Sequence, residues 1–130
     1  MKPFTILAMT AGLAFAGCAS APPPPAPRQV ADTDAGPVSL ARGQILDIAL
    51  PLNAGTGYGW RLDREAPADV LSGGSSRTTD AGGLPGGPIK TIYSYQAVGR
   101  GTADLSFTLK RPWEADKPDD RRVAFKIQVR

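Results

Sequence analysis

Apolar and polar residues alternate along most of the chain from residue 37 to residue 130, which is the pattern of β-strands with one buried face. No window has the three-to-four-residue apolar spacing of an amphipathic helix, and Pro67 limits residues 63–71 to one short turn. Six or seven short strands in about 95 residues are typical of an immunoglobulin-like β-sandwich. The clear runs are 44–50, 58–63, 89–98, 102–110 and 122–130, with weaker ones at 37–41 and 77–80.

The sequence therefore predicts an all-β fold, an immunoglobulin-like sandwich of about seven strands without a disulfide. Trp60 occupies the third strand, where such folds bury a Trp between the sheets, and we expect it in the core rather than at a ligand. The other inward-facing positions share the even spacing of a half-buried strand. They are Leu46, Ile48, Leu50, Tyr58, Leu62, Ala103, Leu105, Phe107, Leu109, Val123, Phe125, Ile127 and Val129. In the run 89–98, Ile92 lies on one face and Tyr93 and Tyr95 on the other.

Three connections of this sandwich are longer than a minimal turn, and the topology brings them out at one end. They follow the second, fourth and sixth strands, whereas Gly99-Arg100-Gly101 forms a minimal turn at the other end. Loops gathered at one end of a rigid sandwich commonly make a binding surface. The loop end is therefore the first place to look for function.

The first 36 residues have a different character. Lys2 precedes an apolar stretch from Phe4 to Phe15, which is too short to span a bilayer as a helix. Small residues and Cys18 follow, and the whole resembles a bacterial lipoprotein signal, although Phe15 stands where Leu is usual. We expect residues 1–17 to be a signal peptide, Cys18 to be acylated, and residues 18–36 to form a Pro-rich tether. The alternative is an ordinary secretory signal that is cleaved near Ala19.

A lipid on Cys18 would hold the protein on a membrane without a spanning helix. Ala19 follows, where an Asp would indicate retention at the inner membrane. The expected location is therefore the bacterial cell envelope, at the outer membrane, on the periplasmic or the surface side.

Composition excludes several functions. The chain has no His, and Cys18 is its only Cys, so it has no Ser–His or Cys–His pair and no zinc site built from such ligands. The 15 basic residues are diluted by 12 acidic ones, unlike a nucleic-acid-binding patch. The carboxylates fall on outward strand positions or in loops, without the facing pair that a glycosidase needs. We expect a monomer that is not an enzyme, with no cofactor and no metal.

The three long connections read Asn53-Ala54-Gly55-Thr56-Gly57-Tyr58-Gly59-Trp60, Gly83-Leu84-Pro85-Gly86 and Arg111-Pro112-Trp113. In this order they resemble the motifs of the chagasin family of cysteine protease inhibitors. The family pattern is Asn-Pro-Thr-Thr-Gly-Tyr-x-Trp, then Gly-x-x-Gly, then Arg-Pro-Trp, on three loops of an immunoglobulin-like sandwich. Ala54-Gly55 departs from the usual Pro-Thr, which removes a rigid proline from the first loop.

The resemblance implies that residues 37–130 are a reversible inhibitor of papain-like cysteine proteases. The first loop would enter the groove near the catalytic Cys, the second would offer Leu84 to an apolar subsite, and Trp113 would contact the protease near its catalytic His. Arg111 would hold its loop by hydrogen bonds to carbonyls, or pair with the protease. The implied binding residues are Asn53, Gly55, Thr56, Gly57, Tyr58, Gly83, Leu84, Pro85, Gly86, Arg111, Pro112 and Trp113.

For several of these residues, a structural role without a protease partner also stays open. Gly55 and Gly57 also suit a tight loop without a partner, Tyr58 suits the edge of the core, and Trp113 would also suit a lid over the sandwich end. A lipoprotein with an immunoglobulin-like adhesion or envelope-assembly module is the alternative function. That alternative explains the signal, the tether and the sandwich, but not three ordered motifs.

Overall fold

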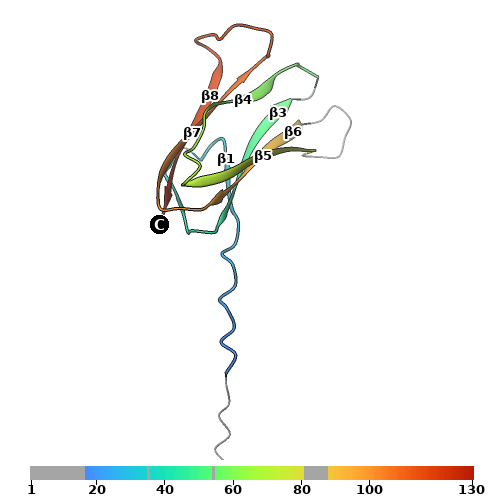
Figure 1. The fold of residues 1–130 in the computed structure, drawn as a ribbon. Coiled ribbons are helices and arrows are strands. Elements are labelled where there is room, and N and C mark those ends of the chain that lie inside the picture. Colours follow the sequence, from blue (N-terminus) through green and yellow to red (C-terminus); the bar gives the residue numbers. More distant parts are fainter. Residues whose placement is uncertain (1–16, 35, 54, 81–87) are drawn as a thin grey trace, which may run out of the picture.

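The computed structural model describes residues 17–34, 36–53, 55–80 and 88–130. It is an all-β sandwich of two four-stranded sheets with the strand orders β1-β3-β6-β5 and β2-β8-β7-β4 (Figure 1). The predicted immunoglobulin-like sandwich is confirmed, with eight strands in place of about seven. Within these ranges no helix is long and apolar enough to cross a membrane. The strands are β1 (Arg28–Ala31), β2 (Val38–Leu40), β3 (Ile45–Asn53), β4 (Gly59–Arg64), β5 (Leu71–Asp80), β6 (Pro88–Ala97), β7 (Gly101–Lys110) and β8 (Arg121–Val129).

The two sheets bury their facing sides against each other. Leu46, Ile48 and Leu50 of β3 are fully buried on one side, as their alternation predicts. Phe107 of β7 is the largest fully buried side chain, and its ring lies 4.7 Å from that of Tyr93 on the opposite sheet. All the buried apolar residues among those described lie between Val30 and Val129, so a chain that starts at Cys18 keeps the whole core.

The strand β1 corrects the predicted boundary of the tether. Residues 18–36 were expected to carry no regular structure, but Arg28–Ala31 pairs in parallel with β3, from Arg28 opposite Leu46 to Ala31 opposite Ala49. Val30 is only 4% exposed. Four residues with one buried apolar side chain show no alternation that a sequence pattern can detect. The sandwich therefore begins at Arg28, and the tether as used below is residues 18–27.

The strand β5 is longer than the predicted strand at 77–80. It begins at Leu71 and passes through Gly73 and Gly74, whose φ angles are 104° and 81°. The register with β6 shifts between Gly73 and Ser75, which is a β-bulge. The strand lies at the edge of its sheet and is exposed over most of its length, so its residues do not alternate.

Strand directions decide which ends of the sandwich meet. Asn53, the last residue of β3, pairs with Pro88, the first of β6, and Gly59 of β4 pairs with Lys110 at the end of β7. The connections 54–58, 81–87 and 111–120 therefore leave from one end, which we call the tip (Figure 1). The tether enters at the opposite end, because β1 runs parallel to β3.

Candidate functional site

The β3–β4 loop at the tip is a tight turn built on two glycines. Gly55 and Gly57 have φ angles of 82° and 77°, in the left-handed region that side chains disfavour. The Thr56 hydroxyl donates to the carbonyl of Asn53 at 2.9 Å and accepts from the Tyr58 amide at 3.5 Å. The proton of the Thr56 hydroxyl is therefore used inside the loop.

The base of this loop is fixed to both sheets through Trp60. Its indole nitrogen donates to the carbonyl of Pro51 on β3 at 2.9 Å, and its own carbonyl accepts from the Tyr93 hydroxyl at 3.0 Å. Trp60 is 9% exposed, so its assignment to the core is confirmed. Because both strands that carry the loop are held, the loop has little freedom to move relative to the sandwich.

Arg111 joins the β7–β8 loop to the β3–β4 loop. Its Nε donates to the carbonyl of Thr56 at 3.0 Å, and its guanidinium carbon lies 4.7 Å from the centre of the Tyr58 ring, a cation–π contact. The same side chain pairs with Glu114 of its own loop at 3.3 Å. Of the two roles proposed for Arg111, the hydrogen bond to a loop carbonyl is the one observed.

Trp113 lies in the first half of the β7–β8 loop and is 72% exposed. The edge of its ring lies on Gly57, where an added β-carbon would be 2.6 Å from Cη2. The indole does not close over the core as a lid. It packs on the neighbouring loop and presents most of its surface to solvent.

Asp116 fastens the same loop to the outer face of the β2-β8-β7-β4 sheet. Its carboxylate accepts two hydrogen bonds from Arg61 at 2.9 and 3.1 Å and pairs with Lys110, whose side chain is only 9% exposed. The bonds from Arg61, and then that from Lys110, hold the pKa of Asp116 far below its usual range. The same pairing raises the pKa of Arg61 above its ordinary value.

Glu114 forms ion pairs with two basic side chains of the same loop, Arg111 and Lys117. Lys117 donates to it at 2.8 Å, and Arg111 pairs with its other oxygen, so the pKa of Glu114 is lowered, chiefly by the bond from Lys117. The one carboxylate of Glu114 is shared by both cations within the loop. Ion pairs within the β7–β8 loop therefore fix the surface around Trp113.

The Gly83-Leu84-Pro85-Gly86 motif lies outside the described residues, so its predicted role is not tested. The strand ends beside it are described: Asp80 pairs with Ile89, and Pro88 pairs with Asn53. The described ends that flank the motif therefore lie next to the end of β3.

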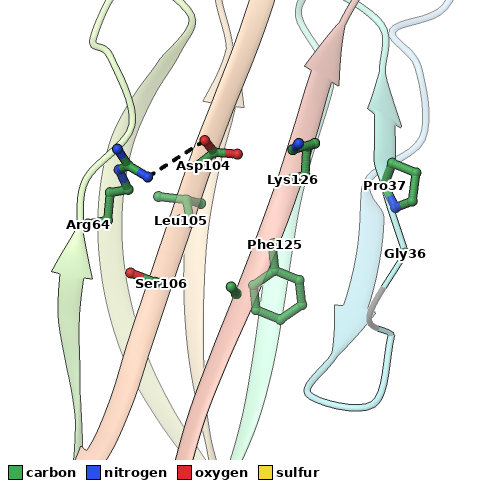
Figure 2. A pocket seen from close by; sticks show the side chains of 9 residues that line it. Gly36, Pro37, Arg64, Asp104, Leu105, Ser106, Phe125 and Lys126 are labelled. Carbon is green, nitrogen blue, oxygen red and sulfur yellow. Dashed lines mark ion pairs between the residues drawn. The ribbon is translucent and has the colours of Figure 1, made fainter.

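A surface hollow lies away from the tip, on the outer face of the β2-β8-β7-β4 sheet (Figure 2). It has a volume of about 430 Å³ and holds the pair Arg64–Asp104 at 3.8 Å, with side chains that are 70% and 50% exposed. Water screens the attraction between these two exposed side chains, so the ion pair contributes little to the shape of the hollow. Within the described ranges no cluster of carboxylate, Cys or His side chains could hold a metal ion.

The sequence matches a family model over residues 39–129, which is most of the chain. The model is described as "Chagasin family peptidase inhibitor I42". The chain belongs to the chagasin family. Comparison with curated proteins gives no match.

Several solved structures share the fold of this chagasin-family chain. The cysteine protease inhibitor EhICP2 from Entamoeba histolytica superposes with a TM-score of 0.69 at 22% identity, covering 81% of this chain and 96% of that one. Amebosin gives 0.58 at 24% identity, covering 80% and 98%. PbICP-C, solved in complex with falcipain-2, gives 0.51 at 19%, covering 79% and 88%. The family is one of peptidase inhibitors, and the chain is not an enzyme.

Within this chagasin-family fold, the structure brings the first and third motifs together at the tip. The sequence reading missed the residues that hold them there, above all Asp116 with its partners Arg61 and Lys110. Lys110 lies on the outward face of its strand, so alternation gave no sign that it would be buried beside a carboxylate.

Proposed function

We propose that this chain is a reversible inhibitor of papain-like cysteine proteases, and that it occludes the active-site cleft with the β3–β4, β5–β6 and β7–β8 loops. The observation that carries the proposal is the contact between Trp113 and Gly57, supported by the bond from Arg111 to Thr56. Two loops with inhibitor motifs thereby form one ordered surface. A neighbour in fold, PbICP-C, was solved in complex with falcipain-2, a precedent for this kind of partner.

Order in the free inhibitor favours tight binding. A loop that is already held in its bound shape loses less conformational entropy on association. Gly55, Thr56 and Gly57 let the backbone approach a narrow groove, because glycine has no β-carbon. Trp113 supplies an exposed aromatic anchor of the type that dominates many interfaces.

The test is a titration of papain with the chain from Cys18 to Arg130, carrying Cys18→Ser, while hydrolysis of a peptide substrate is followed. We expect reversible, competitive inhibition. Trp113→Ala should raise the inhibition constant at least about tenfold, because truncating a hot spot costs about 2 kcal/mol or more. Val98→Ala, an exposed apolar residue at the opposite end, is the matched control and should leave the constant unchanged.

Absence of inhibition by the folded chain would reject the proposal and leave the adhesion or envelope-assembly module in its place. An unchanged constant for Trp113→Ala would remove that residue from the binding surface. Circular dichroism of each variant distinguishes lost binding from lost fold.

We also propose that the chain is a lipoprotein held in the bacterial cell envelope, at the outer membrane, through acylated Cys18. Cys18 is exposed and free, and the tether that carries it leaves the sandwich opposite the tip. Mass spectrometry of the membrane fraction should find a diacylglyceryl mass on a peptide that starts at Cys18. A soluble, unmodified chain that starts near Ala19 would contradict this.

A further inference from the structure

The end of the sandwich opposite the tip gathers four arginines around the β2–β3 turn. In this turn the amide of Gly43 donates to Ala97, at the start of the turn that carries Arg100. The side chain of Gln44 donates to the carbonyl of Ala26, at the end of the tether. The amide of Arg130 donates to the carbonyl of Leu40 just before the turn. These bonds bring together Arg28, Arg42, Arg100 and Arg130, and we call this surface the tether end.

All four arginines are exposed, and among the described residues none lies within 4.0 Å of a carboxylate oxygen. The basic residues of the tip differ, since Arg111 and Lys117 are paired within their loop. Glu65 and Asp69 in the β4–β5 connection are the acidic side chains on this side. Four arginines against two acids leave two positive charges in excess, so the tether end is electropositive.

Exposed apolar side chains accompany these charges. Three large apolar residues of the described chain are clearly exposed, and one of them is Trp113 at the tip. The other two, Ile45 at 44% and Val98 at 39%, both belong to the tether end. Ile45 opens β3, and Val98 follows the last residue of β6, which bonds to the β2–β3 turn. Arginines surrounding exposed aliphatic side chains are typical of a surface that meets lipid headgroups.

We propose that the tether end docks on an anionic lipid surface and so directs the tip away from the membrane. In the cell, the docking rests on the proposed anchor at Cys18, because the tether keeps the tether end close to the bilayer. Ten residues of extended, Pro-rich chain span about 30 Å at about 3.1 Å per residue, which gives this end a high local concentration at the surface. The tip then faces a protease arriving from solution (Figure 1).

The docking is tested with the Cys18→Ser chain, residues 18–130, which keeps every strand and the whole core but carries no lipid. Its partition is measured by sedimentation with vesicles of phosphatidylglycerol and phosphatidylethanolamine, and with vesicles of neutral phosphatidylcholine. We expect binding to the anionic vesicles that declines as salt is raised from about 0.05 to about 0.3 M, since salt screens exposed charges.

A matched pair of double variants locates the surface. Arg42→Gln with Arg100→Gln should weaken partition about 25-fold, because each basic residue near an anionic surface contributes about fivefold. Lys90→Gln with Lys126→Gln removes the same charge from exposed positions within β6 and β8, outside the β2–β3 turn and the residues bonded to it, and should change partition much less. Equal losses in the two pairs would overturn the proposal, as would equal binding to neutral and anionic vesicles.

Each variant is also titrated against papain, which separates this inference from the proposed inhibition. The Arg42→Gln, Arg100→Gln chain should inhibit like the parent, and Trp113→Ala should bind vesicles like the parent. Vesicle binding without protease inhibition would reject the proposed function alone. Inhibition without vesicle binding would reject the docking surface alone.

Discussion

The ring of Trp113 rests on the backbone of Gly57, so close that a β-carbon added there would lie 2.6 Å from Cη2. The two residues belong to loops 56 positions apart in the chain. Their contact makes the orientation of Trp113, the most exposed aromatic side chain among the described residues, depend on a position that has no side chain. A substitution in the β3–β4 loop should therefore change the position of Trp113 in the β7–β8 loop.

Gly57→Ala is expected to weaken inhibition of papain at least about tenfold, the size of a lost hot spot. The added methyl group would displace the Trp113 ring, and the φ angle of 77° is unfavourable for alanine. The inhibition constant and Trp fluorescence are the measurements.

Gly43→Ala is the control for backbone strain alone. Gly43 also has a positive φ, 87°, but an added β-carbon would meet nothing within 4 Å. This variant should lose stability yet inhibit normally. Equal inhibition by Gly57→Ala and the parent would show that the Trp113 contact does not matter for binding.

Arg111→Lys is expected to weaken inhibition by roughly fivefold, since a lost hydrogen bond from a charged group costs about 1 kcal/mol or more. Lysine keeps the charge but cannot reproduce both the bond to Thr56 and the contact with the Tyr58 ring. The inhibition constant reports the effect, and Arg77→Lys, away from the tip loops, is the control. Full activity of Arg111→Lys would mean that Arg111 acts through charge alone.

Asp116→Asn is expected to lower the melting temperature. The substitution leaves the nearly buried Lys110 and its neighbour Arg61 without their shared carboxylate. Asp104→Asn removes an exposed carboxylate 3.8 Å from Arg64 and should leave the melting temperature nearly unchanged. Equal shifts in the two variants would show that the Asp116 cluster contributes no more than an ordinary surface pair.

The difference in stability between the parent and Asp116→Asn should depend on pH. Folding lowers the pKa of Asp116 from 3.8, so its contribution is complete above that value and declines as the pH falls through the lower folded pKa. Melting temperatures should differ fully from pH 7 down to about 5 and converge in more acidic solution. A difference that grows as the pH falls below 4 would contradict the assigned pairing.

Alternation of residues predicted most of the sandwich because most strands have one buried face. Alternation did not predict the strands that lack a face buried along most of their length. The strand β1 buries only Val30, and β5 is an edge strand whose Gly73 and Gly74 form a bulge. In neither strand does the burial of side chains impose the period of two that a sequence can display.

The motifs located the tip, and the positive φ angles of Gly55 and Gly57 agree with the role expected for glycine there. The contacts between loops could not be predicted in the same way. Arg111 meets Thr56 and Asp116 meets Arg61 across 55 positions of sequence, and local patterns carry no information about such pairs. They depend on the register of β4 with β7, which is set by the packing of the whole sheet.

The parallel pairing of β1 with β3 has a mechanical consequence. A pull on the tether acts on β1 at Arg28, while a pull from a bound protease acts on β3 through Asn53, at the far end of the neighbouring strand. The two forces slide the strands along each other, so the bonds between them carry the load together instead of opening one after another. A protein stretched between its anchor and its target would thus be loaded in shear, the direction in which a strand pair resists rupture best.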